Sequence, residues 1–270
     1  MKIIYPLLLI LLATAAQAQH SLEKIWESDT TLAIPESVLF DKNVLYIALI
    51  GGQPWDADGN GHIGKMDKNG KLISATWASG LNAPKGMGIS GKKLYVADIS
   101  DVVVINTESG KVESKIPVEG ATGLNDITID KKGVVYVSDS KLNRVHQIKK
   151  GKAELYLSDL KGVNGLKAID NDLYILTAND VLKADADKKL STIATTEMGG
   201  DGIEPIGNGD FVISCWPGLV YYLDKGGKLE IMLDTREQKR NTADIGYNTA
   251  ERIVYVPTFF KKSVVAYKLK

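Results

Sequence analysis

Val135-Tyr136-Val137-Ser138 is one of six short runs of β-branched and aromatic residues that recur along the chain. Residues of these types favour β-strands. The other runs are Leu45-Tyr46-Ile47-Ala48, Leu94-Tyr95-Val96-Ala97, Leu173-Tyr174-Ile175-Leu176, Phe211-Val212-Ile213-Ser214 and Val254-Tyr255-Val256-Pro257. Their second positions are 49, 41, 38, 38 and 43 residues apart, close to the roughly 40–45 residues of a four-stranded propeller blade. The repeat predicts an all-β protein, a six-bladed β-propeller with four-stranded antiparallel blades.

The pieces within one repeat keep the same order in every blade. The third repeat has an inner strand at Asp126 to Asp130, a Lys-Lys-Gly turn, the Tyr136 strand, and further strands at 144–148 and 153–157. The last repeat stops after its third strand, Val264 to Leu269, whereas Ser21 to Glu27 has the pattern of an outer strand without a blade. We therefore expect the N-terminal strand to complete the last blade, which closes the ring and removes exposed sheet edges.

The first 18 residues have the pattern of a secretory signal peptide. Lys2 provides a positive start, Ile3 to Ala13 an apolar core, and Ala16-Gln17-Ala18 a cleavage site between small residues. The apolar stretch is shorter than the roughly 20 residues of a membrane-spanning helix. We expect export to a periplasm or to the outside, no insertion into a membrane, and a single propeller domain over residues 19–270.

Charge and cysteine content narrow the possible partners and the means of stabilisation. The chain has 33 basic and 33 acidic residues, which indicates neither a nucleic-acid partner nor an acidic membrane surface. Cys215 is the only cysteine, so packing and strand pairing must hold an exported protein together without an internal disulfide. Because Cys215 follows an apolar run, we expect a buried thiol. Nothing in the sequence identifies a protein partner.

The residues that open the inner strands predict a metal site. Inner strands line the axis of a propeller, so these residues form a ring around the channel. The aligned positions are Glu36, Lys85, Asn125, Asn164, Asp201 and either Ala243 or Asp244. Oxygen ligands suit a hard cation, and calcium is the ion we expect, with magnesium, manganese or zinc as alternatives. None of the three histidines occupies a ring position, which disfavours zinc. Taken singly, an Asn or Asp before Gly is more typical of a turn.

Four motifs carry a family resemblance: Pro35-Glu36-Ser37-Val38-Leu39-Phe40-Asp41, Leu124-Asn125-Asp126-Ile127, Val163-Asn164-Gly165-Leu166 and Gly200-Asp201-Gly202. In this order they resemble the blade-opening motifs of the senescence-marker-protein/gluconolactonase family, the regucalcin-like propellers that include luciferin-regenerating enzymes. The resemblance spans nearly all of residues 19–270. It implies that Glu36, Asn164 and Asp201 coordinate a divalent metal, that Asn125 contacts the metal or the substrate, and that Asp201 also serves as general base. It further implies hydrolysis of a small-molecule lactone or ester.

One departure from the family pattern concerns the substrate. Family enzymes that act on sugar lactones resemble one another in an arginine two residues before the asparagine of the third-blade motif, and here that position is Gly123. The departure argues against gluconolactone as the substrate. Lys85 either supplies a cation to the ring in place of that arginine and contacts the substrate, or is an ordinary lysine at the start of a strand.

Two aromatic residues are candidates for substrate contact. Trp55 lies in the loop 51–62, which accounts for the long first spacing and which connectivity places on the same face as Glu36. This loop includes Asp56-Ala57-Asp58-Gly59-Asn60-Gly61 and, with Asp67, has the spacing of an EF-hand calcium loop without its flanking helices. A second calcium site and a solvated hairpin both remain open. Trp216 occupies the corresponding loop of blade five, near Phe259-Phe260 of blade six, where aromatic residues form a binding rim or pack the blades together.

Two glycine motifs are weaker evidence of function. The glycines of segments 59–64 and 86–91 match the spacing of a dinucleotide loop, but neither segment leads into a helix, so we interpret both as turns.

Two functions stay in competition. The first is an exported metal-dependent hydrolase of a lactone or ester. The second is a propeller that binds a metal, a ligand or a protein without catalysis, because one fold hosts many functions.

Overall fold

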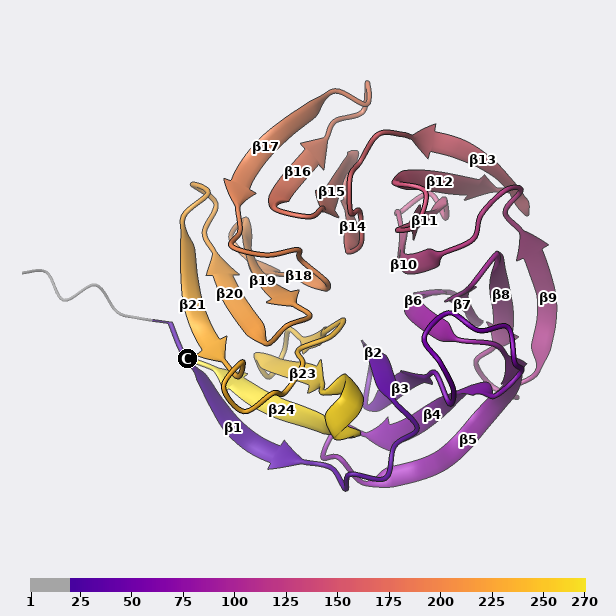
Figure 1. Ribbon diagram of the computed structural model, residues 1–270, viewed down its shortest axis with the longest axis horizontal. Coiled ribbons are helices and arrows are strands. Elements are labelled where there is room, and N and C mark those ends of the chain that lie inside the picture. Colours follow the sequence, from indigo (N-terminus) through magenta and orange to yellow (C-terminus); the bar gives the residue numbers. More distant parts are fainter. Residues whose placement is uncertain (1–19) are drawn as a thin grey trace, which may run out of the picture.

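The computed structural model describes residues 20–270, so the predicted signal peptide lies outside the described residues. Within that range the chain forms six four-stranded antiparallel sheets, arranged radially around one axis (Figure 1). The only helical element of residues 20–270 is a single 3-10 turn, η1 (Phe259–Lys261). The all-β, six-bladed propeller that the repeat predicts is confirmed.

Blades 1 to 5 each consist of four consecutive strands, the innermost first. Blade 1 is β2 (Pro35–Asp41), β3 (Val44–Leu49), β4 (Gly61–Asp67) and β5 (Leu72–Leu81), and blade 2 is β6 (Pro84–Ser90), β7 (Lys93–Asp98), β8 (Asp101–Asn106) and β9 (Val112–Pro117). Blade 3 is β10 (Leu124–Ile129), β11 (Val135–Asp139), β12 (Arg144–Lys149) and β13 (Lys152–Leu157). Blade 4 is β14 (Leu166–Ile169), β15 (Asp172–Leu176), β16 (Asp180–Ala184) and β17 (Leu190–Thr195), and blade 5 is β18 (Ile203–Gly207), β19 (Asp210–Cys215), β20 (Leu219–Leu223) and β21 (Leu229–Asp234).

Blade 6 joins the two ends of the described chain. It is β22 (Gly246–Asn248), β23 (Ile253–Pro257), β24 (Val264–Leu269) and, as the outer strand, β1 (Leu22–Glu27). β1 runs antiparallel to β24, with Leu22 opposite Leu269 and Glu27 opposite Val265. The predicted closure is therefore confirmed. The Glu27 carboxylate strengthens it by accepting hydrogen bonds from Arg240 Nη1 at 2.7 Å and Ser263 Oγ at 2.9 Å.

The hydrophobic core lies between the blades. Six clusters of buried apolar side chains each combine residues from two neighbouring blades, and together they bind every blade to the next around the ring. The repeated tyrosine contributes to this packing, since Tyr46 and Tyr255 are 4% and 0% exposed. The Cys215 thiol is buried and unpaired, as expected, and burial raises its pKa to about 12.

The antiparallel order of the strands defines two faces. Each inner strand begins on the face that also carries the loops between second and third strands, and we call this face the mouth. The loop between β3 and β4 lies on the mouth and crosses blade 2 (Figure 1). No helix among residues 20–270 is long and apolar enough to span a bilayer.

Candidate metal centre

The predicted ring residues open the inner strands at equivalent backbone positions. Asp201 N donates to Ser214 O at 2.7 Å, Asn164 N to Leu176 O at 2.9 Å, and Ala243 N to Pro257 O at 3.0 Å. This shared register assigns the sixth ring position to Ala243. Asp244 is one residue further along the inner strand and belongs to the next level of the channel.

Four of the ring side chains are deeply buried. Lys85 and Asp201 are each 2% exposed, Glu36 is 5% exposed and Asn125 7%, whereas Asn164 is half-buried. Asn164 Nδ2 donates a hydrogen bond to Asp201 Oδ1 at 2.7 Å, which joins blades 4 and 5. Asn125 Nδ2 donates to Ser140 Oγ at 3.0 Å, and Ser140 Oγ donates to the Val163 carbonyl at 2.6 Å. Ser140 thus orients Asn125, a role that the sequence did not reveal.

Burial and mutual repulsion disfavour the charged form of the ring carboxylates. Burial raises the pKa of Glu36 to about 7, against the attraction of the Lys85 ammonium. Burial also raises the pKa of Asp201 well above its usual value, and the nearby carboxylates of Glu36 and Asp126 raise it further. The pKa of Lys85 is lowered by its burial, although Glu36 and Asp201 oppose that shift. These couplings place Glu36, Lys85 and Asp201 in one electrostatic unit.

A second level of carboxylates lies one residue deeper than the ring. Asp126 accepts backbone hydrogen bonds from Ile127 and, across the blade boundary, from Leu166, both at 2.6 Å. Asp244 Oδ2 accepts a side-chain hydrogen bond from Ser37 Oγ at 2.5 Å, which joins blades 6 and 1. A Cβ at Gly202 would lie 2.6 Å from Asp244 Oδ1 and 2.5 Å from the Ile245 nitrogen. Glycine is therefore required there because the neighbouring blade approaches so closely.

The channel below this level carries a further charged pair. Lys167 Nζ contacts Glu204 Oε2 at 2.6 Å, and both residues line a small cavity of about 30 Å³ together with Asp126 and Asp244. Burial raises the pKa of Asp126 to about 7, even though Lys167 lies near it. Across the described part of the channel, carboxyl groups outnumber lysines. The channel therefore favours the binding of an added cation.

The donor set of the ring fits a hard divalent cation. Glu36 Oε2 is buried and has no hydrogen-bond partner among the described residues. Both asparagines donate through Nδ2, so each Oδ1 remains available as an acceptor or ligand. No three His, Cys, Asp or Glu side chains within residues 20–270 gather into a metal site by themselves. A centre at the ring must therefore use the asparagine oxygens, and mixed carboxylate and amide oxygen ligands are typical of calcium.

Trp55 lies at the edge of the ring. Lys85 Nζ is 4.3 Å from the centroid of the Trp55 ring, and Lys141 Nζ is 4.7 Å from it. Gly123, the position at which the resembling enzymes carry arginine, is covered by the Lys141 side chain, whose Cγ would lie 2.6 Å from a Cβ built there. The structure thus brings Lys85 and Trp55 together as candidate substrate-binding residues, and adds Lys141.

The loop 51–62 does not form an EF-hand site. Asp58 Oδ1 accepts a hydrogen bond from Asn60 N at 3.0 Å within the loop. Asp67 ends β4, seven residues long, and accepts backbone bonds from Asn69 and Lys71, both at 2.9 Å, in a turn on the opposite face. A strand rises about 3.3 Å per residue, so Asp67 lies too far from Asp56 to bind the same ion.

Trp216 packs with other aromatic residues on the mouth. Its ring makes edge-to-face contacts with Phe259 and Phe260, at centroid distances of 5.4 and 6.0 Å. Trp216 and Phe260 remain 37% and 57% exposed. The cluster forms part of the rim over blades 5 and 6, and its contact with a substrate stays a prediction.

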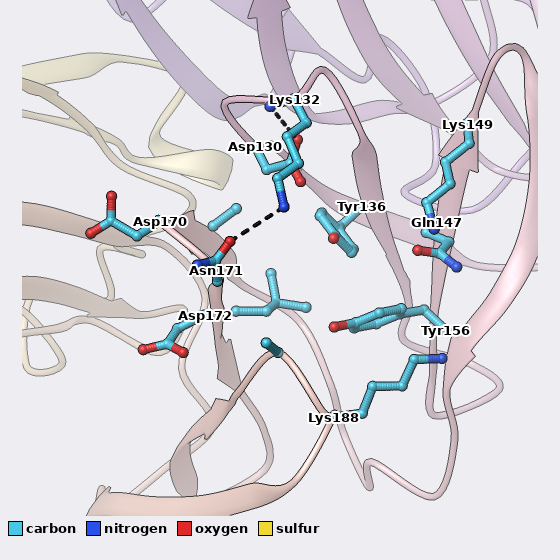
Figure 2. Close-up of a pocket in the computed structure, with 13 residues that line it drawn as sticks. Asp130, Lys132, Tyr136, Gln147, Lys149, Tyr156, Asp170, Asn171, Asp172 and Lys188 are labelled. Atoms are coloured by element: carbon cyan, nitrogen blue, oxygen red, sulfur yellow. Dashed lines mark hydrogen bonds between the residues drawn. The ribbon is translucent and has the colours of Figure 1, made fainter.

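A larger hollow lies on the face opposite the ring. It has a volume of about 320 Å³ and lies between blades 3 and 4, where Tyr136, Tyr156 and Lys188 border it (Figure 2). Its rim contains the turns after β10 and β14, where Lys132 Nζ donates to Asn171 Oδ1 at 3.3 Å. The hollow contains none of the ring residues, so it is separate from the candidate centre.

Comparison with known proteins identifies the fold. No family model and no curated protein sequence matches the chain. Among solved structures, a putative gluconolactonase is similar with a TM-score of 0.72 and 13% identity, over 94% of this chain and 93% of the other. A catalytically inactive virginiamycin B lyase from Staphylococcus aureus, solved with quinupristin, has a TM-score of 0.66 and 12% identity, over 93% and 100%.

A third similar structure is a nidogen/laminin complex, with a TM-score of 0.65 and 13% identity, over 85% of this chain and 87% of the other. Identities this low establish the fold alone. The six blades and their closure agree with the resemblance that the blade-opening motifs carry. The chain has a six-bladed propeller architecture that it shares with these structures, with the residues of those motifs at the mouth of its channel.

Proposed function

We propose that this protein is an exported, divalent-metal-dependent hydrolase of a small lactone or ester. The observation that carries the proposal is the contact of Asn164 with Asp201, beside a Glu36 whose carboxylate acts on Asp201 and has a buried oxygen without a partner among the described residues. The family resemblance of the motifs supports a lactone or ester substrate. The fold similarity to a lyase and to a gluconolactonase-like protein supports an enzyme.

The ring residues would have distinct roles in such a reaction. Glu36, Asn164 and Asp201 would hold the ion through oxygen atoms, and Asn125 would contact the ion or the substrate. A bound divalent ion supplies Lewis-acid polarisation of the substrate carbonyl. Asp201 Oδ1 accepts the hydrogen bond from Asn164, which leaves Oδ2 to bind the ion or to take a proton from water. Burial raises the pKa of Asp201 above its usual value, which makes its carboxylate a stronger base than an exposed aspartate.

A non-catalytic binding propeller is the second candidate. The observation that favours it is the exposed aromatic cluster of Trp216 and Phe260, because exposed aromatic side chains are enriched at protein interfaces. The structural similarity to a propeller from a nidogen/laminin complex agrees with this alternative. A purely structural ion would be fully enclosed, whereas a catalytic ion keeps an open coordination position.

Hydrolysis after metal removal tests the two candidates against each other. The protein is stripped with chelator, resupplied with calcium, magnesium, manganese or zinc, and assayed on a panel of lactones and aryl esters. Turnover that one of these metals restores, and that Asp201→Asn removes, is the result expected for the hydrolase. Tight metal binding without turnover on any substrate would favour the binding propeller.

A further inference from the structure

Trp55 lies within reach of two lysine ammonium groups at the mouth of the channel. Lys85 Nζ and Lys141 Nζ are 4.3 and 4.7 Å from the centroid of its ring. The two ammonium nitrogens are therefore at most about 9 Å apart, the sum of the two distances. Lys85 is 2% exposed, whereas Lys141 is exposed. The Lys85 amine is thus buried beside the Trp55 ring, whereas Lys141 is open to solvent.

Neither ammonium is neutralised by a direct ion pair. Among residues 20–270, no carboxylate oxygen lies within 4 Å of the Lys85 or Lys141 nitrogen in a salt bridge. The nearest acidic neighbour of Lys141 in the chain, Asp139, accepts backbone hydrogen bonds instead, from Thr122, Lys141 and Leu142 at 3.1 to 3.2 Å. Lys141 therefore keeps its donors available for a ligand.

Gly123 gives Lys141 its position. A Cβ at Gly123 would lie 2.6, 2.9 and 3.0 Å from Cγ, Cβ and Cδ of Lys141, so the lysine stem fills the space that any larger residue would occupy. The backbone of Gly123 does not lie in the left-handed region, so glycine is needed there for this contact rather than for its φ angle. The Lys141 stem thus packs against Gly123 while its ammonium group reaches the Trp55 ring of blade 1.

Lys85 and Lys141 adjoin the candidate metal centre. Lys141 follows Ser140, which accepts the hydrogen bond from Asn125, and Lys85 belongs to the ring itself. A ligand that places its carbonyl at the ring can therefore extend past Lys85 toward Lys141. Lysine ammonium groups act as strong donors to carboxylate and phosphate oxygens.

We propose that Lys141, Lys85 and Trp55 form an anion subsite, which selects lactones or esters that carry a carboxylate or phosphate group away from the reacting carbonyl. Lys141 attracts the anionic group, Lys85 holds it at the edge of the ring, and Trp55 positions the two ammonium groups through cation–π contacts. The selection of substrates rests on the proposed function, because it requires hydrolysis at a carbonyl. The binding of an anion by these three residues does not.

A matched pair of esters tests the selectivity. Mono-4-nitrophenyl glutarate is anionic and 4-nitrophenyl valerate is neutral, and their kcat/KM ratio is measured with calcium in the wild type and in three variants. Lys141→Met removes the charge, Gly123→Ala displaces the lysine stem, and Lys188→Met is the control. Lys188 is also an exposed lysine, 4.6 Å from an aromatic ring centroid, that of Tyr156, but it borders the hollow on the opposite face.

The wild type is expected to prefer the anionic ester. Lys141→Met and Gly123→Ala should each reduce that preference about five- to tenfold, the effect of a single charge in a partly solvated site, and added salt should weaken it. Lys188→Met should leave it unchanged. A wild type that prefers the neutral ester, or a control that loses the preference equally, would overturn the inference.

Anion binding without turnover provides an independent readout. Glutarate and inorganic phosphate are titrated separately into chelator-treated protein, and the indole N–H signal of Trp55, assigned with Trp55→Phe, is followed by NMR. A shift that Lys141→Met weakens supports the subsite, and the more effective anion distinguishes carboxylate from phosphate. No shift with either anion would overturn it. A shift without hydrolysis of these esters or of any lactone or aryl ester in the panel would instead refute the proposed function and leave the subsite standing.

Discussion

The side-chain amide of Asn164 donates its hydrogen bond to Oδ1 of Asp201 at 2.7 Å, across the boundary between blades 4 and 5. This single contact fixes the orientation of both groups. The Asn164 oxygen is left to face a cation, and the second Asp201 oxygen is left to hold a proton or an ion. Two residues 37 positions apart therefore act as one unit because the propeller repeat brings their strands together.

Replacing Asp201 by asparagine tests the charge of this unit while preserving its shape. The asparagine oxygen can still accept from Asn164, so the fold should persist. Loss of a buried, repelled carboxylate should leave the thermal midpoint of the metal-free protein unchanged or raise it. Hydrolysis should fall at least about 100-fold, the scale of general base catalysis. Circular dichroism and turnover on the same sample measure both effects, and full turnover by Asp201→Asn would remove its catalytic role.

The stability of the metal-free protein should fall as pH rises. The pKa values of Glu36 and Asp126 are about 7 in the folded protein, against about 4 in an unfolded chain. The folded state therefore binds more protons between pH about 4 and 7, and the favourable contribution of these protonated groups is lost as pH rises through that window.

Thermal unfolding of chelator-treated protein at pH 5 and pH 8 measures this effect. We expect a lower midpoint at pH 8, with a smaller difference between the two pH values in Glu36→Gln. Calcium should raise the midpoint more at pH 8, where the carboxylates are charged. A midpoint that is higher at pH 8 without metal would contradict the assignment of these pKa values.

Glycine at position 202 should be necessary for the close approach of blades 5 and 6. A Cβ there would lie 2.5 Å from the backbone nitrogen of Ile245, so Gly202→Ala should destabilise the protein by about 1–3 kcal/mol, as overpacking does. Gly199→Ala is the control, because its nearest contact would be an ordinary 3.4 Å. Urea unfolding compares the two variants. Equal stability of both would show that the interface between blades 5 and 6 relaxes freely.

Glu27 should contribute to the closure of the ring. Its carboxylate accepts from Arg240 and Ser263, and its side chain is 19% exposed. Glu27→Ala should therefore cost about 1–2 kcal/mol by leaving these donors unpaired. Glu23→Ala, in the same strand, removes an exposed pair with Lys270 and should have almost no effect. Urea unfolding measures the stability of both variants. A similar loss of stability in the two would show that backbone pairing alone closes the ring.

Much of the fold could be predicted because the repeat is local. A tyrosine-centred strand every 40 or so residues is visible in the chain, and so is the missing outer strand of the last repeat. The sixth ring position could not be resolved between Ala243 and Asp244, because β22 has only three residues and a shift of one residue fits the pattern equally well. Backbone hydrogen bonding resolves it in favour of Ala243.

The surroundings of the ring were harder to predict, because they depend on contacts between blades. Nothing in the spacing of Asp126 indicates that its carboxylate accepts a hydrogen bond from Leu166 of the next blade. Gly123 was recognised as the loss of an arginine, but only the conformation of the loop between β11 and β12 shows that Lys141 fills its place. The EF-hand spacing was misleading since it ignores the strand that separates Asp56 from Asp67.

Calcium titration by isothermal calorimetry measures the metal centre itself, using chelator-stripped protein and the Asp201→Asn variant under identical conditions. We expect one ion per chain in the wild type, with binding lost or at least about tenfold weaker in the variant, because a carboxylate ligand is gone. Absence of binding in the wild type, or equal affinity in both proteins, would contradict a metal centre at the ring.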